Sequence, residues 1–155
     1  MVSYLREFTL KSIAKNKRAW FDYELSEPLE AGIELQGWEV KSIRAGRAQI
    51  KESHVTIKQN EVWCVYAHIS PLPTASTHIV PDERRRRKLL LKRKQINALI
   101  GAVERKGFTI VPLELYWKNN KIKLKIALAK GKKKFDKRED AKEKDIKRSL
   151  QRKYN

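Results

Sequence analysis

The sequence contains few residues whose types and spacing could support catalysis. No second thiol accompanies Cys64, and the histidines lack the i,i+4 spacing of a helical metal site. These three histidines are His54, His68 and His78. A metal-free ribonuclease could combine His78 with a lysine and Glu83, because catalytic groups can converge from distant segments. No glycine-rich phosphate loop, nucleophile elbow or paired-carboxylate motif is present. We therefore expect a protein that is not an enzyme and holds no metal or cofactor.

Positive charge is the strongest functional signal. The chain has 36 lysines and arginines against 18 acidic residues, hence a formal net charge of +18 and a pI near 10.1. This favours a polyanionic partner, because contacts to phosphate release condensed counterions. The run Arg84–Arg87 is interpreted as a solvated basic helix face that can steer phosphates, and arginine suits bidentate phosphate contacts. No apolar run approaches the roughly 20 residues that span a bilayer, so we expect no membrane association.

Cys64 lies in the apolar run 62–66, which is typical of a buried strand. A single thiol cannot form an internal disulfide, and no cluster of cations surrounds it in the sequence, so we expect it to be buried and inert. Charged residues interrupt the N-terminal segment, where a secretory signal would have a continuous apolar core. A mitochondrial presequence is the alternative, but Glu7 disfavours it. We expect the protein to be cytoplasmic.

The first elements that must position these residues are predicted as follows. Residues 1–15 are expected to form a flexible lead, and the aromatic-rich run 20–25 favours a strand. Apolar residues on one helical face predict a helix over residues 28–46. Gly32 and Gly37 disfavour this helix, and such glycines could instead allow an RNA backbone to approach closely.

Two strands are predicted next, around residues 55–57 and at 62–69, joined by a tight turn. Residues 70–81 contain three prolines and are expected to form a loop. Tryptophans in such a chain are more often core residues than platforms for bases. We expect this of Trp20, Trp38 and Trp117.

Asp82 is expected to cap a basic helical stretch that passes into the apolar stripe of residues 96–103 and ends at Gly107. Two strands, 108–117 and 121–129, follow with a turn at two asparagines between them. Lysines occupy alternate positions of the second strand. This alternation predicts one buried face and one face lined with ammonium groups.

A basic tail begins at Lys130. The last 26 residues contain twelve lysines and arginines but few large apolar side chains, which cannot offset the chain entropy alone. We expect residues 130–155 to be disordered in the free protein and helical when bound, since they contain favourable i,i+4 charge pairs. For residues 16–129, about six strands with two or three helices predict a mainly β fold, an OB-like closed barrel.

Several short segments carry a more specific pattern. In chain order they are NKRA (16–19), EAGI (30–33), GWEVKSIRAG (37–46), RKLLL (87–91), GFTIVPL (107–113), LYWKN (115–119), IALAKGKK (126–133) and DKR (136–138). Each segment alone is weak evidence. Together and in this order, over about residues 16–140, they resemble the SsrA-binding protein family, also called small protein B. The resemblance implies an OB-like barrel with accessory helices, in agreement with the predicted strands.

The resemblance also implies a function. Members of this family bind the tRNA-like domain of tmRNA (SsrA RNA). They help to deliver it, charged with alanine and carried by elongation factor Tu with GTP, to ribosomes stalled on truncated messages. Their C-terminal tail occupies the decoding centre of 16S rRNA and the empty mRNA channel. We expect this chain to act in trans-translation in the same way, as a monomer.

Two sets of RNA-contacting residues are implied by the same resemblance. The tmRNA-binding set is Asn16, Lys17, Arg18, Glu30, Lys41, Arg44, Arg87, Lys88 and Leu90. The tail set, for the decoding centre and the mRNA channel, is Lys130, Gly131, Lys132, Lys133, Lys134, Phe135, Asp136, Lys137 and Arg138. In the tail, Phe135 stands where the family often has a histidine or another ring, so it can stack on a base but cannot hydrogen-bond through its ring.

The chemistry of three of these residues suits RNA. Asn16 can donate and accept, Glu30 can accept from base amino groups or 2′-hydroxyls, and Leu90 can pack on an unstacked base. For Glu30 an alternative stays open, a residue in the first turn of a helix that interacts with the helix dipole. For the chain as a whole, the alternative function is that of a ribosomal or single-strand RNA-binding OB protein, which would have no preference for tmRNA.

Overall fold

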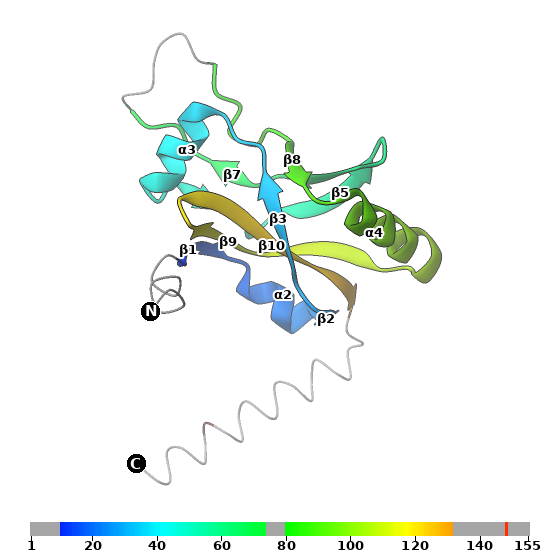
Figure 1. The fold of residues 1–155 in the computed structure, drawn as a ribbon. Coiled ribbons are helices and arrows are strands. Elements are labelled where there is room, and N and C mark those ends of the chain that lie inside the picture. Colours follow the sequence, from blue (N-terminus) through cyan, green and yellow to red (C-terminus); the bar gives the residue numbers. More distant parts are fainter. Residues whose placement is uncertain (1–9, 74–79, 132–147, 149–155) are drawn as a thin grey trace, which may run out of the picture.

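The computed structural model describes residues 10–73, 80–131 and 148 (Figure 1). Short strands and three helices follow one another along the chain. They are β1 (Lys11–Lys15), α2 (Lys17–Asp22), β2 (Tyr23–Leu25), β3 (Leu29–Ile33), α3 (Gly37–Arg44), β4 (Ala48–Gln49), β5 (His54–Lys58), β6 (Glu61–Val65), β7 (His68–Ile69), β8 (Arg87–Leu90), α4 (Arg93–Lys106), β9 (Thr109–Lys118) and β10 (Lys121–Gly131).

Six strands close into an antiparallel barrel. Their order is β9–β5–β6–β8–β3–β10, and β10 pairs again with β9 to complete the ring. β1 adds to β9 outside this ring, β2 adds to β10, and β4 and β7 form a separate small sheet. Closure leaves no unpaired sheet edge along the ring, which removes a template for aggregation. The prediction of a mainly β, closed barrel of about six strands is confirmed.

Two tight turns connect neighbouring strands of the barrel. Gln59 and Asn60 have φ of 54° and 59°, and Asn119 and Asn120 have φ of 49° and 64°. Positive φ at both central residues is the geometry of a type I′ turn, which matches the twist of a hairpin and which asparagine tolerates well. Both predicted turns are confirmed.

The barrel core is built from alternate residues of its strands and from two helices. The α4 stripe contributes Ile96 and Leu99, and α3 contributes Trp38 and Ile43, all of them buried. Helix α4 ends at Gly107, which has a φ of 70° in the left-handed region that glycine adopts without strain. Figure 1 shows α3 and α4 on different sides of the barrel. The predicted helix over the 96–103 stripe is therefore confirmed.

The predicted helix over residues 28–46 is wrong in its first half. Leu29–Ile33 is the strand β3, which pairs with both β8 and β10. The helix begins only at Gly37, where Gln36 and Glu39 form a reciprocal capping box, and the Gln36 backbone N–H donates to Glu39 Oε1 at 2.7 Å. Pairing with two distant strands outweighs the helical spacing of the local apolar residues.

Three further segments also differ from their predicted states. Residues 84–91 were predicted as a helix but contain the strand β8, because Leu89 points into the core while Lys88 and Leu90 point outward. Residues 20–22 complete α2 rather than starting a strand. Residues 11–15 form β1 on the edge of β9, so the expectation of a flexible lead is wrong for this segment.

Candidate nucleic-acid interface

A groove on the outer face of the barrel brings together residues from three neighbouring strands. β3 supplies Glu30 and Gly32, β8 supplies Lys88 and Leu90, and β10 supplies Lys123. Gly32 lies between the other two strands, paired with Leu90 on one side and with Lys123 on the other. The groove has a volume of about 620 Å³. Three of the predicted tmRNA contacts, on two strands, therefore share one surface.

Glu30 is held in this groove by a defined set of hydrogen bonds. The Tyr116 hydroxyl donates to its Oε2 at 2.5 Å, and the Lys118 ammonium donates to both carboxylate oxygens at 3.2 Å. The Tyr116 hydrogen bond is the largest cause that lowers the pKa of Glu30; Lys118 and Lys123 lower it further, and burial opposes them. Glu30 is thus an ionised acceptor, and it lies in a strand, so the helix-dipole alternative is wrong.

Basic and aromatic side chains border the groove on the β6–β8 side. Lys88 is paired across the strands with Trp63, and the Arg86 guanidinium lies 5.6 Å from the centre of the Trp63 ring. Glu61 forms an ion pair with Arg93 at 2.7 Å and lies 4.0 Å from Lys88 Nζ. Leu90 is 49% exposed beside them, an apolar side chain next to these charged groups. Such a surface can contact phosphates and an unstacked base together.

Asn16, Lys17 and Arg18 lie on a second surface, at the junction of β1 and α2. The Asn16 amide donates to the Pro112 carbonyl at 2.9 Å, and its backbone N–H donates to the Leu113 carbonyl at 2.9 Å. Asn16 is therefore buried and anchors this junction to β9. Lys17 and Arg18 are exposed on α2. They are placed to approach a phosphate, whereas the Asn16 amide is already used inside the protein.

The remaining predicted residues lie elsewhere. Lys41 and Arg44 are exposed on α3, and the Arg44 guanidinium lies 5.6 Å from the centre of the Trp117 ring. Lys130 and Gly131 end β10, where Gly131 pairs with Tyr23. Lys132–Arg138 lie outside the described residues. The predicted tmRNA-binding residues are thus distributed over the groove, the β1–α2 junction and α3. Of the predicted tail residues, the structure describes only Lys130 and Gly131.

Comparison with known proteins assigns a family to this barrel. The sequence profile described as "SmpB protein" matches residues 13–155. The chain belongs to the SmpB family. Among curated relatives, the SsrA-binding protein of Thiobacillus denitrificans is 56% identical over 141 residues, covering 91% of this chain and 95% of that protein. The SsrA-binding protein of Alkalilimnicola ehrlichii is 55% identical over 140 residues, with coverages of 90% and 88%.

A solved structure described as "tmRNA-SmpB: a journey to the center of the bacterial ribosome" contains a similar chain. The TM-score is 0.62 at 41% identity, and the match covers 77% of this chain and 84% of the other. This level of identity goes beyond a shared architecture. The predicted resemblance to the SmpB family is confirmed.

Within this SmpB-family barrel, Arg87 has a different place from the one that we predicted. Its side chain is fully buried and donates to Glu39 of α3, to the Ala67 carbonyl at 2.8 Å and to the Glu83 carbonyl at 3.2 Å. Arg85 donates to the other oxygen of the same carboxylate at 2.6 Å. A guanidinium enclosed in this way cannot contact RNA, so the prediction of Arg87 as an RNA contact is wrong. Its role is to fix β8, and with it Lys88 and Leu90.

Sequence reasoning missed three residues that surround Glu30. Tyr116, Lys118 and Lys123 come from segments far from Glu30 in the sequence, and only strand pairing brings them to it. Gly32 lies on the same strand as Glu30, and the sequence indicated it as a possible point of close approach for an RNA backbone. A partial signal existed, because the alternating lysines of 121–125 predicted a basic outer face of β10. That face is confirmed, since the intervening apolar residues point into the barrel.

The other candidate residues that the structure describes form no reactive cluster. Cys64 is buried as predicted, and burial raises the pKa of its thiol to about 11. His68 Nε2 lies 2.6 Å from Glu83 Oε2, and the His54 ring stacks edge-on against Tyr66. His78 lies outside the described residues. Over the described part of the chain, no cluster of potential metal ligands occurs and no helix could span a membrane.

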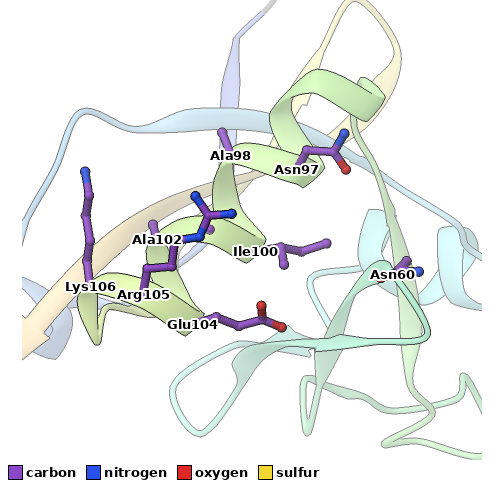
Figure 2. Close-up of a pocket in the computed structure, with 9 residues that line it drawn as sticks. Asn60, Asn97, Ala98, Ile100, Ala102, Glu104, Arg105 and Lys106 are labelled. Carbon is purple, nitrogen blue, oxygen red and sulfur yellow. The ribbon is translucent and has the colours of Figure 1, made fainter.

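One further hollow, of about 510 Å³, lies between the β5–β6 turn and the outer side of α4 (Figure 2). Asn60 borders it from the turn, and Asn97, Glu104 and Arg105 border it from the helix. None of the predicted RNA contacts lines this hollow. It therefore serves as a reference surface for the experiments on the groove.

Proposed function

We propose that this chain binds the tRNA-like domain of tmRNA and acts with it in trans-translation on stalled ribosomes. The observation that carries the proposal is the groove between β3, β8 and β10, where Glu30, Lys88 and Leu90 converge in a member of the SmpB family. The names of its relatives, SsrA-binding proteins, support the same RNA as ligand. In this proposal the chain is a binding protein and performs no chemical step.

The groove combines the two kinds of contact that RNA recognition needs. Lys88 and Lys123 can neutralise phosphates, which adds affinity without reading sequence. Glu30 and Leu90 can read an exposed nucleotide, because a carboxylate accepts only from specific donors and an apolar side chain packs only on an unstacked base. The exposed Lys17 and Arg18 on α2, with Lys41 and Arg44 on α3, extend the contact along the RNA backbone in this proposal.

The tail has a separate task in the proposal. The tail, predicted as residues 130–155, occupies the decoding centre of 16S rRNA and the empty mRNA channel in this proposal. The part beyond Gly131 becomes helical there, since Lys130 and Gly131 are paired with β2. Elongation factor Tu with GTP takes part through the alanyl-tmRNA, so this chain need not contact it. The barrel works as a monomer in the cytoplasm. Lys130 and Gly131 still belong to β10, which places the root of the tail on the barrel itself.

Competition binding near physiological salt tests the proposal. Labelled tRNA-like domain bound to the full chain is challenged with unlabelled tmRNA and, separately, with elongator tRNA. The expected result is that tmRNA competes far better. Equal competition by both RNAs, with one steep salt dependence, would instead support a generic RNA-binding OB protein. RNA recovered intact after long incubation would exclude the ribonuclease alternative.

A matched pair of variants locates the interface. Glu30→Gln in the groove and Glu104→Gln in the hollow on α4 make the same chemical change at two separate places (Figure 2). We expect Glu30→Gln to weaken tmRNA binding and Glu104→Gln to leave it unchanged. Equal effects of the two variants would mean that the groove is not the binding surface.

Truncation after Gly131 tests the division of labour, because it keeps β10 complete. We expect the truncated chain to bind tmRNA nearly as well as the full chain and to fail in peptide tagging on stalled ribosomes. If tmRNA binding falls in proportion to the lost positive charge, the separation of the two tasks is wrong.

A further inference from the structure

Tyr116 is the residue that connects the groove to the wall of the barrel. It lies on β9, its side chain is almost completely buried, and it is paired with Lys123 of β10. Burial, followed by the hydrogen bond to Glu30, raises the pKa of Tyr116 above its ordinary value, so its hydroxyl keeps its proton. Tyr116 is thus a permanent donor that RNA itself can hardly reach. What it can do is orient the carboxylate of Glu30.

The two oxygens of Glu30 are not equivalent. Oε2 accepts from both Tyr116, at 2.5 Å, and Lys118, at 3.2 Å. Oε1 accepts from Lys118 at 3.2 Å. Because a carboxylate oxygen can accept two hydrogen bonds, Oε1 retains the capacity for one further donor. The carboxylate therefore presents a single, oriented acceptor to a ligand in the groove.

Gly32 lets Leu90 lie close to β3 beside this acceptor. A Cβ atom at this position would lie 3.1 Å from the Cβ of Leu90, closer than ordinary van der Waals contact. Leu90 Cδ1 lies 3.5 Å from the same point, so the Leu90 side chain packs against Gly32. The half-exposed Leu90 forms an apolar wall of the groove that Glu30 also lines. A flat base can lie against such a wall while its edge or its ribose reaches a carboxylate.

We propose that Tyr116 is a positioning residue that holds Glu30 so that its Oε1 accepts one hydrogen bond from a single nucleotide seated against the exposed side of Leu90. The proposal rests on the proposed function, because the nucleotide belongs to the bound RNA. The donor is an exocyclic amino group or a ribose 2′-hydroxyl, both of which carry a hydrogen that one carboxylate oxygen can accept. Lys88 and Lys123, on either side, contact the flanking phosphates.

The first test is a double-mutant cycle in the full chain. Tyr116→Phe removes only the hydroxyl, and we expect it to weaken binding of the tRNA-like domain by about tenfold, as for the loss of one charge-assisted hydrogen bond. In the Glu30→Ala background the same change should have no further effect. Tyr66→Phe is the matched control, since Tyr66 is exposed outside the groove, and it should bind as the parent does.

The salt dependence of RNA binding helps to distinguish the loss of a positioned Glu30 from a general loss of the binding surface. Tyr116 makes no phosphate contact in this proposal, so Tyr116→Phe should lower the affinity at every salt concentration without changing the slope of log K against log salt. Thermal unfolding of each variant, followed by circular dichroism, shows whether the fold is kept. If Tyr116→Phe costs tenfold in the Glu30→Ala background as well, it acts independently of Glu30 and the proposal is wrong.

A second test changes the RNA and leaves the protein intact. Single 2′-deoxy substitutions, and base analogues that lack the exocyclic amino group, are introduced along the tRNA-like domain. One such change should weaken binding to the parent chain by about tenfold and have no effect on Glu30→Ala. Whether it is a 2′-deoxy or a base substitution identifies the donor. If every substitution affects both proteins equally, Glu30 accepts no hydrogen bond from RNA.

The two proposals fail in different ways. If the parent chain shows no preference for tmRNA over elongator tRNA, the proposed function itself is wrong. If the preference exists but Tyr116→Phe binds as tightly as the parent, only the positioning role of Tyr116 is wrong.

Discussion

Arg87 of β8 donates a hydrogen bond to Glu39 of α3, and both side chains are completely inaccessible to solvent. The same guanidinium also donates to two backbone carbonyls, and Arg85 satisfies the second carboxylate oxygen. A buried ion pair costs desolvation free energy, so this one must be held by its full set of hydrogen bonds. It joins α3 to the strand that carries Lys88 and Leu90 into the groove.

Breaking this pair should therefore be costly. Arg87→Met leaves Glu39 buried opposite an apolar side chain, and we expect the free energy of unfolding to fall by about 3–5 kcal/mol. Urea denaturation followed by tryptophan fluorescence measures it. The exposed Arg84→Met should change the free energy by no more than about 0.5 kcal/mol. Similar losses in both variants would mean that the buried pair is no more important than an exposed arginine.

A phosphate contact and a base contact in the groove should differ in their response to salt. Lys88→Ala should weaken tmRNA binding and reduce the slope of log K against log salt by about 1, because one counterion fewer is released. Leu90→Ala should weaken binding with the slope unchanged. Filter binding over a range of salt concentrations measures both, and a slope change in Leu90→Ala would contradict the assignment.

Two tryptophans that look alike in the sequence should differ in their effect on stability. Trp38 is 7% exposed and packs in the core, whereas Trp20 is 57% exposed on α2. We expect Trp38→Ala to lower the free energy of unfolding by about 3–5 kcal/mol and Trp20→Ala by about 0.5 kcal/mol or less. Chemical denaturation of the two variants compares them. Our prediction that all three tryptophans considered belong to the core is wrong for Trp20.

Cys64 should react slowly in the folded protein. Burial raises the pKa of its thiol to about 11, above the value of about 8.5 for an exposed cysteine. Iodoacetamide at about pH 8.5 should therefore modify the denatured chain far faster than the native one. Since the folded pKa is the higher one, the stability that this thiol contributes is complete below about pH 8.5. It declines as the pH rises towards about 11.

Fast labelling of Cys64 in the native state, at the rate of the denatured chain, would contradict its burial. A matched comparison uses Cys64→Ala in pH titrations of stability. This variant should show a weaker loss of stability between about pH 8.5 and about pH 11, because the thiol no longer titrates on unfolding.

Local patterns predicted those elements whose formation depends on neighbouring residues. The apolar stripe of α4 and the asparagine turn between β9 and β10 are encoded within a few positions, and both appear as predicted. Leu29–Ile33 is different, because its apolar residues fit a helical period as well as a strand. Its state is decided by β8 and β10, which lie 50 or more positions later in the chain. Contacts at such a separation leave no local signal.

In the candidate site too, some residues could be predicted from the sequence, and others depend on contacts between distant segments. Glu30, Lys88 and Leu90 were named from a family resemblance, and the barrel brings them together. The resemblance implied Arg87 as well, but its partner Glu39 is 48 positions away. Nothing in the run of four arginines distinguishes the buried Arg87 from the exposed Arg84 and Arg86. Tyr116 lies in the segment LYWKN (115–119), but nothing in that segment indicates its partner. Its relation to Glu30 exists only once β9, β10 and β3 are paired.

Strand β10 passes along the groove at Lys123 and continues without interruption to Gly131, the root of the tail. It is paired on the way with β3, β9 and β2, with one register shift against β9 between Lys125 and Ile126, so this stretch belongs to the sheet and is not a free linker. Eight residues at about 3.3 Å each set roughly 26 Å between groove and tail root. The length of β10 thus fixes the separation between the groove and the root of the tail. A one-residue insertion would lengthen it by a single step and turn every later side chain to the opposite face.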